Sequence, residues 1–187
     1  LCREEVTEID ENELTLIASG PLTEGALAEE ITRLTGQESL SFFDAAAPIV
    51  AADSLNMEKI FAASRYGRGT ADYLNCPFDK AGYEEFYEAL VNAERAELHE
   101  GDTINVYEGC MPVEIMAKRG MDTLRYGPLR PVGLVNPATG HRPWANIQLR
   151  SENKENSLYN LVGFQTNLKF GEQKRVFSMI PGLENAE

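Results

Sequence analysis

The sequence has few of the residues that metal and disulfide sites require. Its 187 residues include three cysteines, Cys2, Cys76 and Cys110, and two histidines, His99 and His141. Three cysteines cannot all pair within one chain, and none lies in a CxxC motif or in a Cys/His cluster with metal-site spacing. We therefore expect reduced thiols in a cytoplasmic protein and no bound metal.

Long apolar runs and a phosphate-binding glycine motif are also missing. No stretch approaches the roughly 20 apolar residues of a membrane-spanning helix, and no signal-peptide pattern opens the chain, so we expect no membrane partner. GxGxxG does not occur in the sequence. Because that loop holds the phosphates of dinucleotide cofactors, no motif assigns flavin contacts to this chain.

Charge is distributed unevenly along the chain. The net charge is -13, with 21 acidic and 7 basic residues in 1–100 but 9 acidic and 10 basic residues in 101–187. A bulk charge of this sign argues against a nucleic-acid partner. The second half nevertheless permits RNA binding, because affinity for phosphate depends on a local basic patch.

The residue pattern predicts an α+β fold. Amphipathic spacing and capping residues predict helices over 23–35 with Thr23 as its cap, 54–64, 80–96 with Asp79 as its cap, and 171–180. The aromatic stripe of 80–96 is predicted to be core. Apolar runs and turn signals predict strands over 6–9, 14–18, 40–50, 132–135, 144–150 and 157–164. Turns over 10–12 and 136–140 would make hairpins of 6–9 with 14–18 and of 132–135 with 144–150. Helices mixed with antiparallel hairpins indicate one α+β region with a mixed or antiparallel sheet and flanking helices.

Cys110 lies in the stretch YEGCMPVEIMAKRG, just ahead of a predicted helix. Pro112 suits the first helical position, and Gly120 suits a left-handed cap at the other end. Unpaired N–H groups and the helix dipole favour a thiolate at Cys110, whereas Glu108 and Glu114 disfavour one. The sequence leaves that balance open, and a free cysteine also packs well as a small hydrophobe.

Cys76 has different surroundings. It stands between apolar residues and directly before Pro77, which fixes an extended backbone at Cys76. This pattern indicates a buried, structural thiol.

Two Arg-Tyr-Gly triplets begin at Arg65 and Arg125, and each is followed closely by another arginine, Arg68 and Arg130. Arginine binds phosphates with two parallel hydrogen bonds, and tyrosine stacks on the unpaired bases of RNA loops. These four arginines form a hypothetical RNA-facing set. The alternative is that they pair with nearby carboxylates.

Six blocks of sequence carry a family resemblance. They are FFDAAAPIVAADSLNM, ASRYGRGTADYLNCPF, YEGCMPVEIMAKRG with LRYGPLRPVGL, LYNLVGFQTNLKFGEQKRVF and MIPGLENAE. In this order they resemble the FAD- and folate-dependent tRNA (uracil-5-)-methyltransferases, relatives of the GidA-type tRNA-modifying flavoproteins. Because that family carries its flavin-phosphate loop upstream of this region, the resemblance implies an internal piece of a larger enzyme, in which residues 1–50 include strands of the flavin domain.

The resemblance also implies an activity. In the family, methylenetetrahydrofolate supplies a carbon, reduced FAD supplies electrons and is replenished by NAD(P)H, and the product is 5-methyluridine in the T loop of tRNA. Cys110 would be the nucleophile that adds to the uracil ring. The partners would be the tRNA T arm and the flavin domain of the parent chain, and residues 160–169 are polar enough to line a folate site. We expect the isolated chain to be colourless and inactive.

Two other functions fit the same residues. In one, the chain is a non-catalytic tRNA-binding insertion and Cys110 merely packs. In the other, the parent protein is a GidA-type enzyme that modifies a wobble uridine. The pattern YEGCMPVE favours the methyltransferases over the second alternative.

Overall fold

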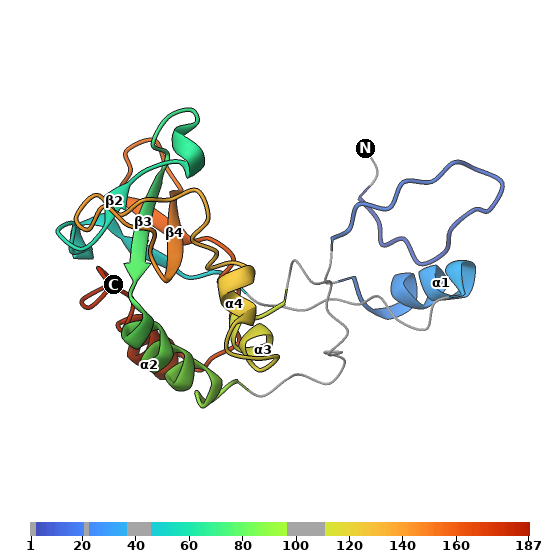
Figure 1. Ribbon diagram of the computed structural model, residues 1–187. Coiled ribbons are helices and arrows are strands. Elements are labelled where there is room, and N and C mark those ends of the chain that lie inside the picture. Colours follow the sequence, from blue (N-terminus) through green and yellow to red (C-terminus); the bar gives the residue numbers. More distant parts are fainter. Residues whose placement is uncertain (1–2, 21–22, 37–45, 97–110) are drawn as a thin grey trace. The chain divides into compact units, whose positions relative to one another are not determined.

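The computed structural model describes residues 3–20, 23–36, 46–96 and 111–187 (Figure 1). It divides into two compact units, Leu1–Phe43 with His99–Val106 and Asp44–Leu98 with Tyr107–Glu187. We describe each unit by itself.

The first unit contains one helix, α1 (Gly25–Thr35), among its described residues. The helix ends as predicted at Gly36, which is left-handed (φ 67°) and donates its N–H to Thr32 O at 2.9 Å. Its start differs from the prediction, because Thr23 donates its hydroxyl to Gly20 O instead of capping the helix. None of the residues that the structure describes in this unit is buried.

The hairpin predicted at the start of the chain is wrong. Its turn is present, since Asn12 N–H bonds Asp10 Oδ1 at 2.9 Å, but residues 6–9 and 14–18 form no strand. An isolated pair of strands has too little apolar surface to bury and is marginal in water. Arg33 of α1 instead contacts Glu11 in this segment at 2.9 Å.

The second unit is built on an antiparallel five-stranded sheet, which confirms the predicted α+β class. The strands are β1 (Ile49–Ala51), β2 (Phe61–Ala62), β3 (Tyr73–Phe78), β4 (Ala145–Ser151) and β5 (Leu158–Leu161). Their order in the sheet is β1-β5-β4-β3-β2, and every neighbouring pair is antiparallel. Residues 40–45 of the strand predicted over 40–50 lie outside the described residues.

Alternation along β3 and β4 gives the sheet two different faces. In the register of these strands, Cys76 opposes Ile147 and Asn75 opposes Gln148. Because successive side chains point to opposite faces, one face is apolar and the other carries amides. The apolar face presents Leu74, Cys76, Phe78, Ala145, Ile147 and Leu149, all of them buried.

Two helices, α2 (Lys80–Val91) and α5 (Phe170–Phe177), lie side by side in Figure 1 and contribute to the core. The predicted cap of α2 is confirmed, because Asp79 Oδ1 accepts the Gly82 N–H at 2.8 Å. The helix ends at Val91, short of the predicted residue 96. Phe86 lies 5.2 Å from Phe78 and 6.3 Å from Phe164 between ring centroids, so the aromatic stripe of α2 is core.

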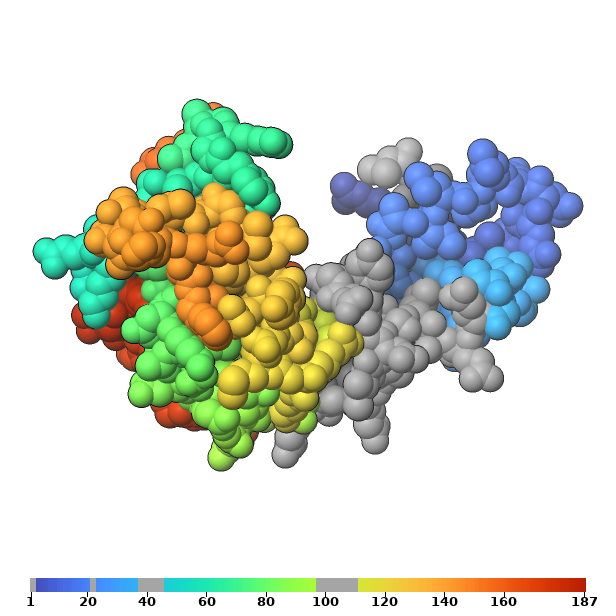
Figure 2. Space-filling model, in the orientation of Figure 1, coloured from blue at the N-terminus to red at the C-terminus, as the bar shows by residue number. Residues whose placement is uncertain are grey.

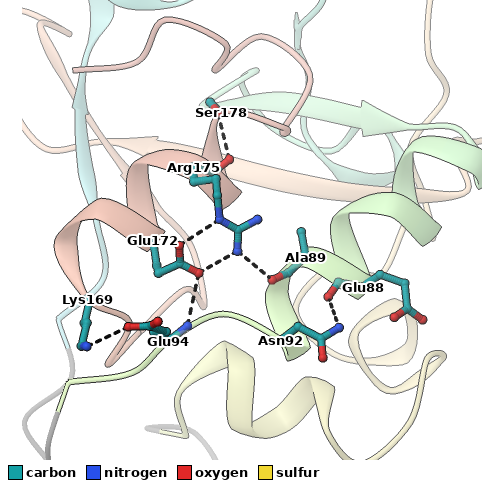
Figure 3. A network of polar contacts seen from close by, with 8 residues as sticks. All are labelled: Glu88, Ala89, Asn92, Glu94, Lys169, Glu172, Arg175 and Ser178. Carbon is teal, nitrogen blue, oxygen red and sulfur yellow. Dashed lines mark hydrogen bonds and ion pairs between the residues drawn. The ribbon is translucent and has the colours of Figure 1, made fainter.

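A polar network joins the end of α2 to α5 (Figure 3). Arg175 bonds Glu172 through both Nε (2.9 Å) and a terminal nitrogen (2.6 Å), and it reaches Ala89 O at 3.4 Å. Glu172 also accepts the Glu94 N–H, and Lys169 pairs with Glu94 at 2.8 Å. These contacts tie the two helices together at the protein surface.

Two further predicted elements are wrong. Residues 54–64 are not a helix, because Asn56 Oδ1 binds the Glu58 N–H in a local turn and β2 follows. Residues 132–135 are not a strand, since Gly133 is left-handed (φ 81°) within a turn. The predicted turn over 136–140 is present, but β4 after it pairs with β3 and β5 rather than forming a hairpin with 132–135.

Candidate functional site

Cys110, the predicted nucleophile, lies outside the described residues, and its geometry stays a prediction. Helix α3 (Val113–Ala117) begins three residues after Cys110, and its first residue, Val113, is fully buried and donates its N–H to Gln165 O at 2.8 Å. Pro112 has extended backbone (ψ 138°) and so precedes the helix instead of occupying its first position. Helix α3 is five residues long, so the dipole along it is weak.

Glu114 anchors α3 to the loop after β5. Its side chain is buried, and its carboxylate accepts the Thr166 hydroxyl at 3.0 Å and the Asn167 N–H at 2.9 Å. The carboxylate is therefore committed to structural hydrogen bonds. Residues 160–169, predicted as a possible folate-site lining, thus include the loop that holds the start of α3, and Phe164 and Leu168 there are buried.

Tyrosines of α2 hold α3 and its neighbour α4 (Thr123–Tyr126) in place. Tyr83 donates its hydroxyl to Met121 O, and Tyr87 donates to Ala117 O at 3.2 Å. Helix α4 was not predicted, and it carries Arg125 and Tyr126 of the second Arg-Tyr-Gly triplet. The structure thereby links the segment after Cys110 to Arg125.

Arg65 is bound mainly by the protein. It donates to Gln148 Oε1 at 3.2 Å and to the carbonyl oxygens of Arg130 and Val132 at 2.7 Å each. Burial, and then the positive charge of Arg130, lower its pKa. Arg68 is exposed, and its guanidinium lies 5.8 Å from the centre of the Tyr66 ring.

Arg125 is also committed to protein contacts. It pairs with Asp122 at 2.7 Å, donates to Trp144 O at 3.0 Å, and stacks 3.7 Å from the centre of the Trp144 ring. The alternative considered for the arginines, pairing with a local carboxylate, therefore applies to Arg125. Such a stack on an aromatic face also fixes the tryptophan.

Arg125 and Arg130 line one groove of about 630 Å³, which brings together two members of the predicted RNA-facing set. Its other lining residues are Tyr126, Pro131, Val132, Arg142, Pro143 and Trp144. Arg142 and Trp144 were missed by sequence reasoning, because neither lies in an Arg-Tyr-Gly triplet. Arg65 is not a lining residue, but it binds the carbonyl oxygens of two residues that are, Arg130 and Val132.

Cys76 is fully buried, as predicted. Burial in the apolar face raises the pKa of its thiol, with a smaller contribution from the negative charge of Glu184. A thiol in this state is a poor nucleophile. The prediction that Cys76 packs as a structural thiol is confirmed.

Within the described ranges, no group of three or more His, Cys, Asp or Glu side chains is arranged to hold a metal ion. Over the same part of the chain, no helix has both the length and the apolar character needed to cross a membrane.

Comparisons with known proteins place these observations in a family. Residues 4–187 match the family model described as glucose inhibited division protein A. The chain is 61% identical over its whole length to the methylenetetrahydrofolate–tRNA-(uracil-5-)-methyltransferase TrmFO of Desulforudis audaxviator. It is 60% identical over 99% of its length to the protein of that name from Desulforamulus reducens, and 60% over 98% to that from Lactobacillus helveticus.

The chain spans 43%, 42% and 45% of the length of these three relatives. Its resemblance to the uracil methyltransferases and to GidA-type proteins, expected from the sequence blocks, is confirmed. Because the family model matches nearly every residue, the chain belongs to the glucose inhibited division protein A family.

Proposed function

We propose that this chain is part of a methylenetetrahydrofolate–tRNA-(uracil-5-)-methyltransferase that forms 5-methyluridine in the T loop of tRNA. The observation that carries the proposal is the identity of about 60%, over nearly the whole chain, to proteins of that name. The described residues support it with a buried scaffold around α3 and a basic groove beside α4.

In this proposal Cys110 is the nucleophile. Carbon five of uracil is not nucleophilic enough to attack a one-carbon electrophile directly. Addition of the Cys110 thiolate at carbon six turns the ring into an enolate, which can attack through carbon five. Loss of the proton from carbon five and release of tetrahydrofolate would leave the new carbon as a methylene group on the ring, and two electrons from the reduced flavin would convert it to methyl while the thiolate leaves. The buried anchors at Val113 and Glu114 fix the chain directly after this thiol.

Methylenetetrahydrofolate would supply the carbon, and reduced FAD, replenished by NAD(P)H, would supply the electrons. No motif in the 187 residues assigns flavin contacts, because the sequence has no GxGxxG loop to hold the flavin phosphates. We therefore assign FAD binding to a flavin domain elsewhere in the parent chain. The proposed enzyme acts in the cytoplasm.

RNA recognition in this proposal involves the arginine set. Arg68 and Arg130 are exposed and can reach phosphates, whereas Arg65 and Arg125 are held by carbonyl and carboxylate groups of the protein. The RNA-facing hypothesis is thus best supported for Arg68 and Arg130.

The test uses the enzyme that carries this chain, with methylenetetrahydrofolate and tRNA that lacks 5-methyluridine. Nucleoside mass spectrometry should find 5-methyluridine in the T loop, and Cys110→Ala should abolish it while the protein keeps its melting temperature. Cys76→Ala is the matched control, and it should retain turnover in the folded protein. Modification at the wobble position instead, or turnover by Cys110→Ala, would overturn the proposal.

A further inference from the structure

The segment from 118 to 150 is strongly basic within an acidic chain. It holds six basic residues and one acid, Asp122, for a net charge of +5, although the whole chain has -13. The basic residues are Lys118, Arg119, Arg125, Arg130, Arg142 and Arg150. In Figure 2 this stretch, coloured yellow to orange, runs over one face of the second unit. The one acid is already paired with Arg125.

Two cations of this segment line the groove without an acidic partner. Arg130 and Arg142 are exposed, and neither makes an ion pair or a side-chain hydrogen bond with any residue that the structure describes. Arg130 also lies close enough to Arg65 for the two positive charges to repel. An anion in the groove would relieve that repulsion, because opposite charges nearby favour the ionised form of both.

The backbone that carries Arg130 is held from two sides. Arg65 binds the carbonyl oxygens of residues 130 and 132, and the Asn146 N–H bonds Leu129 O at 3.0 Å. Gln148 accepts from Arg65 and donates to Asn75 Oδ1 at 3.1 Å, which connects the groove to the sheet interior. Arg130 is therefore presented on a fixed loop, which reduces the entropy lost when a ligand binds.

We propose that this groove binds the sugar–phosphate backbone of RNA, with Arg130 and Arg142 contacting phosphates and Arg65 positioning Arg130. The choice of RNA as ligand rests on the proposed function. Guanidinium groups match phosphate with parallel hydrogen bonds. Tyr126, which is 76% exposed at the groove, offers a ring on which an unpaired base can stack. A groove for an acidic peptide would have no need of that ring.

The test measures the affinity of the enzyme that carries this chain for a T-arm RNA hairpin by fluorescence anisotropy, between about 50 and about 200 mM salt. Each lost phosphate contact lowers the slope of log affinity against log salt by about 0.7–0.9, which corresponds to roughly a threefold smaller loss of affinity over this range. Arg130→Gln and Arg142→Gln should each show that change. Arg150→Gln is the matched control, since Arg150 belongs to the same basic segment but pairs with Glu152 outside the groove, and its slope should equal that of wild type.

The positioning role of Arg65 is tested by a double-mutant cycle. Arg65→Lys keeps the charge but cannot hold both carbonyl groups in the same way. It should weaken RNA binding in the wild-type background and have no further effect in Arg130→Gln. An equal effect in both backgrounds would contradict a role exerted through Arg130.

The proposal that the groove binds RNA would be overturned if the slopes for Arg130→Gln and Arg142→Gln equal the slope for Arg150→Gln. It would also be overturned if polyglutamate displaces the RNA as readily as unlabelled RNA does. Methylation by the wild-type enzyme, assayed in parallel, separates the two proposals. If methylation occurs and the slopes do not change, only the groove is wrong. If methylation fails while the slopes change, the groove stands and the proposed function is wrong.

Discussion

The two faces of the central sheet use the same strands for different purposes. On one face, Cys76 and Ile147 pack with the aromatic side chains of α2 in a dry core. On the other face, Asn75 and Gln148 form hydrogen bonds that reach Arg65 and the groove. Because successive side chains of a strand point to opposite faces, one face stabilises the fold and the other positions the candidate RNA contacts.

The energetics of the faces differ as well. Burying an aromatic ring removes a large apolar area from water, whereas a hydrogen bond between amides adds only about 1 kcal/mol net. One amide oxygen, Asn146 Oδ1, is buried without a partner among the described residues. The amide face thus fixes the positions of side chains more than it adds to the free energy of unfolding. Substitutions on the two faces should separate an effect on position from an effect on stability.

The largest loss of stability should come from the apolar face. Phe86→Ala removes a fully buried ring that contacts Phe78 and Phe164, and it should lower the free energy of unfolding by about 3–5 kcal/mol. Urea denaturation measures the change. Phe170→Ala is the control with the same chemistry at an 84% exposed site, and it should cost less than about 0.5 kcal/mol. Equal losses would contradict the assignment of the core.

On the amide face, Asn75→Ala should cost about 1–3 kcal/mol, because it leaves buried polar groups unpaired. Asn75 donates to the carbonyl groups of Phe61 and Ala63 and accepts from Asn146 and Gln148. Unlike Phe86→Ala, it should also weaken RNA binding by the protein that remains folded. The control is Asn92→Ala at the surface. If the folded Asn75→Ala variant bound RNA with unchanged affinity, the claim that this face positions the groove would be contradicted.

Cys76 offers a chemical probe of the apolar face. Its pKa is raised by burial, so the native thiol stays protonated while the unfolded thiol ionises near pH 8.5. The contribution of Cys76 to the free energy of unfolding is therefore fully present below that pH and is lost as the pH rises above it. Iodoacetamide, followed by peptide mass spectrometry, should label Cys110 in the native enzyme and Cys76 only on unfolding. Faster labelling of Cys76 would contradict both assignments.

The smallest effect belongs to the surface network of Figure 3. Hydrogen bonding to Arg175 lowers the pKa of Glu172 to about 2. Its contribution to stability is present above the unfolded pKa, about 4.3, and is lost as pH falls toward about 2. Glu172→Gln should be slightly less stable than wild type in thermal melts at pH 6, with the difference gone near pH 2. A difference independent of pH would exclude the ion pair as its cause.

Local signals predicted much of the fold. The Asp79 cap, the aromatic stripe of α2, α5 and the turn over 136–140 each depend on residues close in sequence. The partner of β4 could not be found in this way, because β3 precedes it by about 70 residues. Because proline cannot donate a backbone hydrogen bond, Pro77 makes the sequence of β3 look like a loop. It is tolerated because the pairing with β2 covers only Leu74 and Asn75, which leaves Pro77 paired on the β4 side alone.

The candidate site was predicted in part. The Arg-Tyr-Gly triplets predicted Arg65 and Arg125 as RNA contacts. In the structure Arg65 binds carbonyl oxygens and Arg125 stacks on Trp144. Arg142 carries no such motif, and only the three-dimensional groove brings it near Arg130. The charge count over 118–150 was the signal in the sequence that could have found it.

The most direct test mixes the enzyme that carries this chain with a T-arm RNA in which 5-fluorouridine replaces the target uridine. Fluorine at carbon five cannot leave as the proton does, so a thiol added at carbon six stays attached. Peptide mass spectrometry should find the RNA adduct on Cys110. An adduct on a different cysteine, with Cys110 unmodified, would contradict the account and leave this chain as a tRNA-positioning scaffold.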